Sequence, residues 1–285
     1  MKTPDELIDD LLTLSFAEDV GDGDATTLST IPADAMGRQH LLVKEDGIIA
    51  GVDIARKVFE KFDPTLKMTV MIPDGTPVKK GDIAFVVEGP VRSLLQTERT
   101  MLNIMQRMSG IATTTARYQA RLNGLKAKVL DTRKTTPGMR LLEKQAVKLG
   151  GGANHRIGLF DMILIKDNHV DFAGGITKAV QRAKEWCREQ NKDLKIEVEV
   201  RNTDEILEAL SAGVDRIMLD NYTPERTAEA VKLIREKNPA VEIESSGGIT
   251  LDTLRAYGEA GVDFISVGAL THSVKGLDMS FKAEK

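Results

Sequence analysis

The chain has 285 residues, with 39 lysines and arginines against 43 aspartates and glutamates, which gives a net charge of −4. A mildly acidic chain with only 4% aromatic residues is not expected to bind nucleic acid, which needs a basic surface and stacking platforms. The single cysteine, Cys187, excludes an internal disulfide and a cysteine-rich zinc site. No apolar run could span a membrane, and the first residues are acidic where a leader would be basic and apolar, so we expect a cytoplasmic protein without a membrane partner.

The first part of the chain, residues 1–115, is expected to form a mixed α/β domain. Thr3 and Glu6 form a capping box that opens its first helix. Ser109 and Gly110 are expected to interrupt its last helix. The elements predicted in chain order are a helix over 3–18, a hairpin around 46–47, a helix over 53–62, two strand-forming runs within 68–89 and a long helix over 93–122.

The run 68–89 also resembles the small sandwich that carries biotin or lipoate. Such a carrier needs an exposed lysine at a hairpin tip, whereas Lys79 and Lys80 precede a Gly-Asp turn. We therefore expect a structural sheet here.

The second part, residues 116–270, alternates short apolar runs with amphipathic helices. Six apolar runs occur, and each except the last is followed by a helix. This alternation predicts parallel strands with crossover helices, in a barrel or an incomplete barrel. A doubly wound open sheet is also compatible with the pattern, although no G-x-G-x-x-G or G-x-x-x-x-G-K-[ST] motif is present.

Polar and ionisable residues gather where these strands end, and function collects at the carboxyl ends of parallel strands. Five of the six ends carry such groups, which predicts a site. The residues at or just after the ends are Arg133, Lys134, Lys166, Asp167, Asn168, His169, Glu197, Glu199, Asp220, Asn221, Ser245, Ser246, Gly247, Gly248, Gly268 and Ala269.

The segment 133–166 has a net charge of +5 within an acidic chain. Lys144 and Lys148 are expected to be solvated helix charges. The other basic residues lie at strand ends or in the GGGANHR loop and predict a small ligand with several anionic groups; they are Arg133, Lys134, His155, Arg156 and Lys166. The run 246–250 is expected to open a helix and to bind a phosphate on its backbone N–H groups.

Two acids, Glu199 and Asp220, follow consecutive strands and should be near neighbours. They could hold Mg²⁺, hydrogen-bond to sugar hydroxyls or stabilise a developing cation. They could also simply neutralise the arginines.

Several motifs resemble those of the quinolinate phosphoribosyltransferases, which are type II phosphoribosyltransferases. The matching runs are DTRKTTPGMR, GGGANHRIGLFDMILIKDNH, IEVEV, MLDN, ESSGG and ISVGALTHS, together with AEDVGDGDATT and ERTMLNIMQRMSGIAT nearer the start. The resemblance implies phosphoribosyl transfer from phosphoribosyl pyrophosphate to quinolinate, with decarboxylation and Mg²⁺, in NAD biosynthesis. It also implies an N-terminal α/β sandwich domain (1–115), an incomplete α/β barrel (116–270) and a tail, 271–285, that packs back on the first domain.

The resemblance further implies roles for single residues. Quinolinate would contact Arg133, His155, Arg156 and Lys166, and Arg99 of the ERT motif would reach the quinolinate of the neighbouring subunit in a homodimer or dimer-based hexamer. Lys134 would lie between the two substrates as a catalytic residue, and Glu199 and Asp220 would bind the ribose and Mg²⁺. The 5′-phosphate would lie along Ser246, Gly247 and Gly268.

Three other functions remain open. A paralogue of the same fold could be specific for nicotinate or linked to molybdenum transport. The retained residues that favour a dicarboxylate are Arg99, Arg133, His155 and Arg156. A Schiff-base aldolase could use Lys166. A non-catalytic phosphosugar-binding protein is disfavoured by the intact Glu199 and Asp220.

Overall fold

The computed structural model describes residues 2–284 and divides the chain into two compact units. Unit 1 comprises the segments up to Ala116, Thr135–Gly151 and from Ala269 onward, and unit 2 comprises Arg117–Lys134 and Gly152–Gly268. The chain therefore leaves unit 1 close to the expected boundary after residue 115. The segment 135–151 differs from expectation, because it belongs to unit 1 and not to the barrel.

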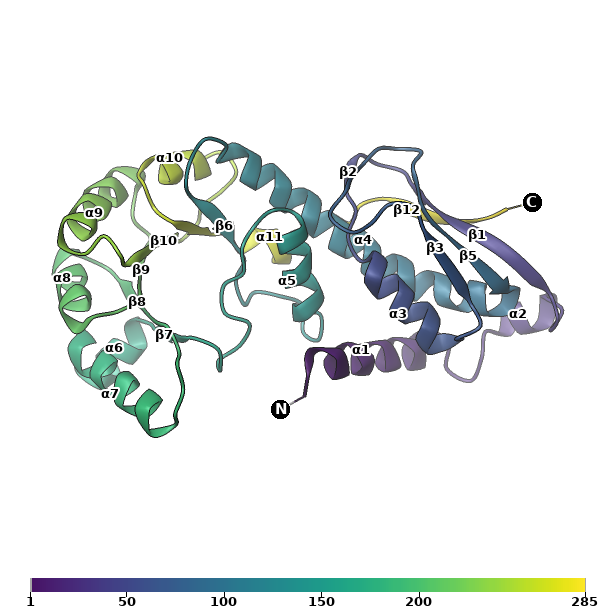
Figure 1. The fold of residues 1–285 in the computed structure, drawn as a ribbon, viewed down its shortest axis with the longest axis horizontal. Coiled ribbons are helices and arrows are strands. Elements are labelled where there is room, and N and C mark those ends of the chain that lie inside the picture. Colours follow the sequence, from purple (N-terminus) through teal and green to yellow (C-terminus); the bar gives the residue numbers. More distant parts are fainter. Residues whose placement is uncertain (1, 285) are drawn as a thin grey trace. The chain divides into compact units, whose positions relative to one another are not determined.

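Unit 1 contains a four-stranded antiparallel sheet in the order β12-β1-β5-β3 and a separate β2–β4 pair. Its elements are α1 (Pro4–Asp19), α2 (Ala25–Thr30), β1 (Met36–Val43), β2 (Gly47–Ile48), α3 (Val52–Phe62), β3 (Lys67–Val70), β4 (Pro77–Val78), β5 (Ile83–Pro90), α4 (Val91–Arg121, which ends in unit 2), α5 (Arg140–Leu149), α11 (Ala269–His272) and β12 (Met279–Ala283) (Figure 1). Phe59, Phe85 and Phe281 pack in its core with ring centroids 6.0–6.2 Å apart. The C-terminal strand thus completes both the sheet and the core of unit 1.

Helix α1 begins at the predicted capping box. Thr3 Oγ1 accepts the N–H of Glu6 at 3.2 Å, and the Glu6 carboxylate accepts the N–H of Thr3 at 2.6 Å. Pro4 occupies the first helical position, where its missing N–H costs no hydrogen bond.

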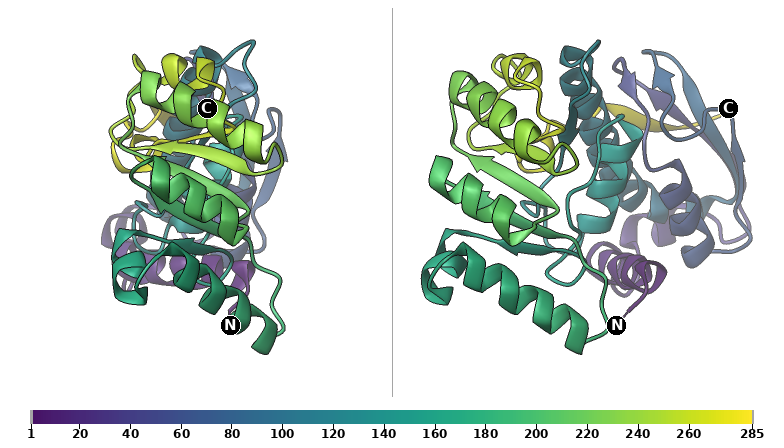
Figure 2. Two further views of the ribbon diagram at one scale, coloured as in Figure 1. Left: turned by 90° about the vertical axis from the view of Figure 1, so that its left-hand side faces the viewer. Right: turned by 60° about the vertical axis from the view of Figure 1, so that its left-hand side comes forward.

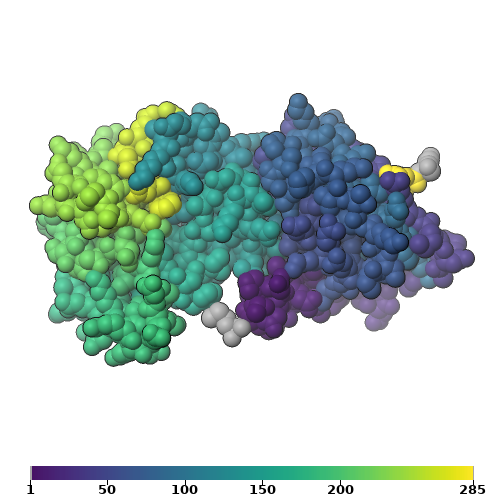
Figure 3. Space-filling view, in the orientation of Figure 1, coloured from purple at the N-terminus to yellow at the C-terminus, as the bar shows by residue number. Residues whose placement is uncertain are grey.

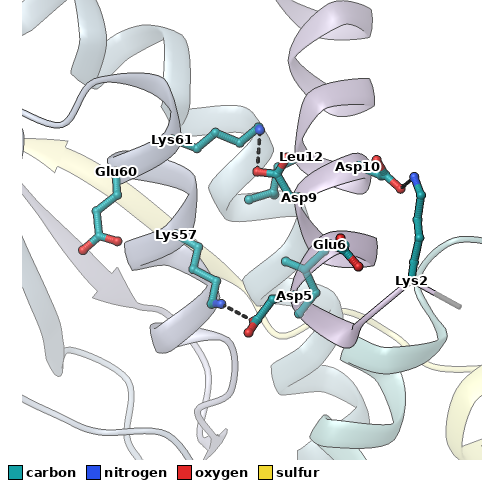
Figure 4. A pocket seen from close by; sticks show the side chains of 10 residues that line it. Lys2, Asp5, Glu6, Asp9, Asp10, Leu12, Lys57, Glu60 and Lys61 are labelled. Atoms are coloured by element: carbon teal, nitrogen blue, oxygen red, sulfur yellow. Dashed lines mark hydrogen bonds and ion pairs between the residues drawn. The ribbon is translucent and has the colours of Figure 1, made fainter.

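A pocket lies between α1 and α3, on the surface of unit 1 where the purple N-terminal segment is visible (Figure 3). Two ion pairs cross it, Lys57–Asp5 at 2.7 Å and Lys61–Asp9 at 2.5 Å (Figure 4). These charges are already paired with one another across the groove.

The predicted hairpin around residues 46–47 is wrong. Strand β1 pairs with β12 and β5, while β2 pairs with β4. The reason is visible at the turn, where Asp46 Oδ1 accepts the N–H of Lys80 at 2.9 Å. This hydrogen bond connects the Asp-Gly turn to the loop before β5, and the residues after the turn pair with β4 instead of with β1.

Helix α4 runs without a break through Ser109 and Gly110, so the predicted interruption is also wrong. Both residues are small because other backbone segments approach the helix closely. Ser109 Oγ accepts the N–H of Ala50 at 2.8 Å and donates to its carbonyl oxygen at 3.0 Å. A Cβ atom at Gly110 would collide with the carbonyl oxygen of Lys275 and lie 3.1 Å from the Cα of Gly276.

Helix α5 belongs to unit 1 because a buried ion pair fixes it to α4. Arg107 Nε donates to Glu143 Oε1 at 2.7 Å, and the side chain of Glu143 is fully buried. Thr136, just before the helix, donates its N–H to Glu143 Oε2 at 3.2 Å. On the same helix Lys148 is exposed as predicted, whereas Lys144 is 1% exposed, so the prediction of a solvated charge there is wrong.

Unit 2 is a six-stranded parallel sheet in the order β6-β11-β10-β9-β8-β7. Its elements are β6 (Lys128–Leu130), β7 (Ile163–Ile165), α6 (Asp167–Ala173), α7 (Ile176–Glu189), β8 (Ile196–Val200), α8 (Thr203–Ala212), β9 (Arg216–Asp220), α9 (Pro224–Lys237), β10 (Glu242–Ser246), α10 (Leu254–Glu259) and β11 (Phe264–Ser266). The strands form an arc with the helices along its outer side (Figure 1), and the green helices cover that face in the turned view (Figure 2, left). Since β6 and β7 are the two edge strands, the arc is an incomplete barrel, as the sequence predicts.

Charged residues occupy the inner face of this arc. Arg216 of β9 is the cross-strand partner of Glu197 in β8 and of Glu242 in β10, so these three side chains share one face. Arg216 Nη2 donates to Glu242 Oε2 at 2.8 Å, and its Nη1 donates to Glu244 Oε2 at 3.2 Å. A network of ion pairs therefore lies within the sheet of unit 2, below the carboxyl ends of the strands.

Among residues 2–284, no helix combines the length and the apolar character needed to cross a membrane.

Candidate active site

The carboxyl ends of all six strands in unit 2 bring most of the predicted site residues to one edge of the arc. Because the strands are parallel, their carboxyl ends meet at the same edge. The residues there are Arg133 and Lys134 after β6, Lys166 after β7, Glu199 in β8, Asp220 at the end of β9, Ser246 and Gly247 where β10 ends, and Gly268 after β11.

Lys166 and Glu199 form an ion pair with an Nζ–Oε2 distance of 3.2 Å. The side chain of Lys166 is about half exposed, at 49%, while that of Glu199 is 10% exposed. A Schiff-base lysine is instead desolvated in apolar surroundings. The environment of Lys166 therefore disfavours the aldolase alternative.

Three residues lie in close contact where β9 and β10 end: Asp220, Asn221 and Gly247. Asn221 Nδ2 donates to Asp220 Oδ2 at 2.6 Å, and the Asn221 N–H donates to the carbonyl oxygen of Ser246 at 2.9 Å. Gly247 has φ +104°, and a Cβ there would collide with the Asn221 amide. Gly247 is thus required by this close approach, which also orients the Asp220 carboxylate.

The run 246–250 was predicted to open a helix directly, and this is wrong. Helix α10 begins only at Leu254, after a bend at Gly247 and Gly248 and a turn over 251–253. A phosphate at Ser246 and Gly247 would therefore meet loop backbone N–H groups and not the positive end of a helix.

Two guanidinium groups, those of Arg133 and Arg156, are near neighbours on the basic side of the site. Burial and the positive charge of Arg133 lower the pKa of Arg156 from its usual range. Arg156 Nη1 donates to the carbonyl oxygen of Met162 at 3.2 Å, while Arg133 is exposed. An anionic ligand with two acidic groups would be attracted by both of these positive charges.

His155 lies on the inner side of the same loop, with its side chain 5% exposed. Its Nε2 is 3.0 Å from Glu197 Oε2 and 3.6 Å from Glu244 Oε2. The ring therefore faces the barrel interior, and its predicted contact with a substrate carboxylate stays a prediction.

Glu197 and Glu244 are fully buried carboxyl groups. The sequence placed Glu197 among the strand-end residues without a role of its own, and it did not single out Glu244. Burial raises the pKa of Glu197 to about 7. Burial and the neighbouring Glu197 charge raise that of Glu244 to about 8. The signal that could have found them is the alternation of acids with apolar residues in IEVEV and VEIES, which puts charges on one face of each strand.

Arg99 belongs to unit 1, where it lies on α4 with an exposed side chain. An exposed position is what contact with a neighbouring subunit requires, and that contact stays a prediction.

Family models match the chain in both parts: the N-terminal domain of quinolinate phosphoribosyl transferase over residues 24–109 and its C-terminal domain over residues 111–282. The chain belongs to the quinolinate phosphoribosyltransferase family. A relative from Nicotiana tabacum, named quinolinate phosphoribosyltransferase [decarboxylating] 1b, is 44% identical over 96% of this chain and 81% of its own length. The chloroplastic nicotinate-nucleotide pyrophosphorylase [carboxylating] of Arabidopsis thaliana is 45% identical over 96% of this chain and 82% of its own.

Solved structures of the family agree with this fold. The nicotinate-nucleotide pyrophosphorylase from Francisella tularensis superposes with a TM-score of 0.91 at 41% identity, covering 99% of this chain and 98% of that one. The incomplete barrel and the unit with the antiparallel sheet are therefore an architecture that this chain shares with a solved nicotinate-nucleotide pyrophosphorylase.

Proposed function

We propose that the chain transfers the phosphoribosyl group of phosphoribosyl pyrophosphate to quinolinate, releasing pyrophosphate and CO₂ and forming nicotinate mononucleotide for NAD biosynthesis. The observation that carries this proposal is the combination of two neighbouring guanidinium groups, Arg133 and Arg156, with two carboxylates, Glu199 and Asp220, at one sheet edge. A dianionic acceptor and a ribosyl donor that develops positive charge need these two environments side by side.

Quinolinate would bind on the basic side through its two carboxylates. Arginine forks match planar carboxylates in a bidentate arrangement, and Lys166 adds a point charge. The repulsion between Arg133 and Arg156 makes this pocket favour an acceptor with two negative charges over one with a single charge.

The donor would bind across β8 to β11. Its 5′-phosphate would lie along Ser246, Gly247 and Gly268, and its ribose hydroxyls would meet Glu199 and Asp220. Lys134, which is exposed beside Arg133, would lie between the donor and quinolinate.

The chemistry begins as the bond between the anomeric carbon and pyrophosphate breaks, so that positive charge develops on the ribosyl group. Glu199 and Asp220 would stabilise that charge, at about 3 kcal/mol per preorganised group. The ring nitrogen of quinolinate then bonds to the anomeric carbon and becomes cationic. As CO₂ leaves, the electron pair of the adjacent carbon–carboxylate bond stays on the ring carbon, where the neighbouring cationic nitrogen stabilises the carbanion, and a proton then bonds to that carbon.

Mg²⁺ fits the donor set on this edge, because it prefers carboxylate oxygens together with substrate phosphate oxygens. Glu199 and Asp220 supply the carboxylates on adjacent strands. Bound there, Mg²⁺ would neutralise charge on the departing pyrophosphate. The ion pair between Glu199 and Lys166 favours Mg²⁺ held mainly by pyrophosphate and water, with these carboxylates nearby.

We also propose a homodimer, or a dimer-based hexamer, in which Arg99 reaches the site of the neighbouring subunit. Mixing Arg99→Ala with Asp220→Asn tests this arrangement, since mixed dimers would contain one intact site. Activity regained on mixing supports shared sites, and a mixture as inactive as its parts contradicts them. A cytoplasmic location stays a prediction, because the Arabidopsis relative is named chloroplastic.

A turnover assay with quinolinate, nicotinate and nicotinamide tests the proposed function. Release of pyrophosphate and CO₂ with quinolinate alone supports it. Release of pyrophosphate with nicotinate but not with quinolinate would favour the nicotinate-specific paralogue.

A further inference from the structure

A closed cluster of three side chains lies below the strand-end site in unit 2. It consists of His155, Glu197 and Glu244, whose ligand-type atoms all lie within 4.8 Å of one another. Glu197 precedes Glu199 by two residues on β8, and Glu244 lies on β10. Burying two carboxyl groups costs free energy, and the chemistry proposed above uses neither of them.

The hydrogen bonds around His155 have a defined direction. The N–H of Arg156 donates to His155 Nδ1 at 2.7 Å, so Nδ1 is an acceptor and the ring proton is on Nε2, facing the two carboxyl groups. The N–H of His155 donates to Asp131 Oδ1 at 2.9 Å. Buried side chains therefore hold the backbone of residues 155–156 at two points.

Glu244 is itself held on both of its oxygens. The Ser266 hydroxyl donates to Oε1, and Arg216 Nη1 donates to Oε2 at 3.2 Å. Arg216 already supplies a positive charge to the cluster. We therefore interpret the cluster as an anchor for the imidazole and not as a metal site.

The residue that depends on this anchor is Arg156. Burial and the charge of Arg133 disfavour its charged form and lower its pKa, while the charges of Glu197 and Asp161 act in the opposite direction. Its guanidinium donates one hydrogen bond, to the carbonyl oxygen of Met162. Its backbone N–H is held by His155 Nδ1, so the position of the His155 ring helps to fix where Arg156 stands.

We propose that Glu197 and Glu244 are positioning residues, which fix the His155 ring and through it the backbone of Arg156, so that the paired guanidiniums are set to receive the two carboxylates of quinolinate. This inference rests on the proposed function and deepens it. It places His155 behind the site, where it acts through Arg156 and not by contact with the substrate.

Glu244→Gln, with Glu242→Gln as its matched control, tests the role of the carboxyl pair. Both glutamates lie on β10 and both pair with Arg216, but only Glu244 also faces His155. Assayed above pH 8, where Glu244 is ionised, loss of this buried carboxylate should raise the KM for quinolinate about tenfold in Glu244→Gln. The KM for phosphoribosyl pyrophosphate should stay within about twofold, and Glu242→Gln should change neither value by more than that.

A second pair of variants tests the direction of the hydrogen bond. The amide oxygen of His155→Asn can replace Nδ1 as the acceptor for the Arg156 N–H, whereas His155→Gln reaches the Nε2 position and leaves that N–H without its acceptor. His155→Asn should therefore keep a quinolinate affinity, measured by calorimetry, several-fold closer to wild type. This pair decides the question if Glu244→Gln does not fold.

Four results would overturn the proposal: an unchanged quinolinate KM in Glu244→Gln, an equal rise in Glu242→Gln, equal losses in the two His155 variants, or a stoichiometric metal in the purified wild type whose removal abolishes quinolinate binding. Failure of the proposed function is distinguishable, because the wild type would then release no CO₂ from quinolinate at all.

Discussion

Replacing Gly247 with alanine should destabilise the protein far more than the same change at its neighbour Gly248. At Gly247, where φ is +104°, a Cβ would lie against the Asn221 amide, 2.7 Å from its Cγ and 2.9 Å from its backbone nitrogen. At Gly248, where φ is +59°, a Cβ would meet nothing within 4 Å. The two variants therefore share a positive φ and differ in the contact.

The magnitude follows from two contributions. An alanine with positive φ costs about 1–2 kcal/mol at either position. At Gly247 the Asn221 side chain must also move, and it then loses its hydrogen bond to the Asp220 carboxylate, a charge-assisted bond worth about 2 kcal/mol. We expect a loss of about 3–4 kcal/mol for Gly247→Ala and about 1–2 kcal/mol for Gly248→Ala.

Urea denaturation of the two variants beside the wild type measures this difference. Because Asp220 loses its orienting partner, Gly247→Ala should also raise the KM for phosphoribosyl pyrophosphate. Equal stabilities for the two variants would refute the close approach of Gly247 to Asn221 as the reason for a glycine there.

Three further predictions address other parts of the molecule. Asp220→Asn should lower kcat at least a hundredfold and leave the Kd for quinolinate within about twofold, because it removes charge at the ribosyl group only; near-normal turnover would exclude Asp220 from the chemistry. Burial holds the pKa of Glu244 at about 8, so the folded chain keeps a proton there that the unfolded chain releases above about pH 4.5. The free energy of unfolding of the wild type should therefore fall, by an amount on the order of a few kcal/mol, as the pH rises from about 5 to 8. Glu244→Gln should abolish this fall. Unfolding free energies from urea denaturation that change with pH in the same way in the wild type and in Glu244→Gln would contradict this. Gly110→Ala should lower the free energy of unfolding, measured by thermal denaturation, by about 3 kcal/mol, because its Cβ meets the backbone of Lys275 and not a movable side chain. A loss below about 1 kcal/mol would show that the backbone around Lys275 can move away to make room for the Cβ.

Local signals predicted the elements whose cause is local. The capping box of Thr3 and Glu6, the helix over 53–62 and the six parallel strands each follow from short-range spacing, and the structure confirms them. Strand-end chemistry was also readable, because parallel strands bring their carboxyl ends to one edge whatever their order.

The errors arise where distant segments decide the local structure. Ser109 and Gly110 look like a helix break, but they are small because the backbones of Ala50 and Lys275 pack against the helix. Lys144 was placed in solvent because helical spacing alone does not show which face α4 covers.

The charged barrel interior was missed for a related reason. Strands buried on both faces are expected to be apolar. Arg216 of β9, however, pairs with Glu242 and Glu244 of the next strand, β10, and no window of sequence contains all the members of this ion-pair network.

One measurement tests the central claim, that a single site couples ribosyl transfer to decarboxylation. Quinolinate labelled in its 2-carboxylate is incubated with the wild-type protein and Mg²⁺, with and without phosphoribosyl pyrophosphate, and labelled CO₂ and pyrophosphate are counted. We predict one CO₂ for each pyrophosphate and no CO₂ without the donor. Release of CO₂ without phosphoribosyl pyrophosphate, or of pyrophosphate without CO₂, would contradict the account.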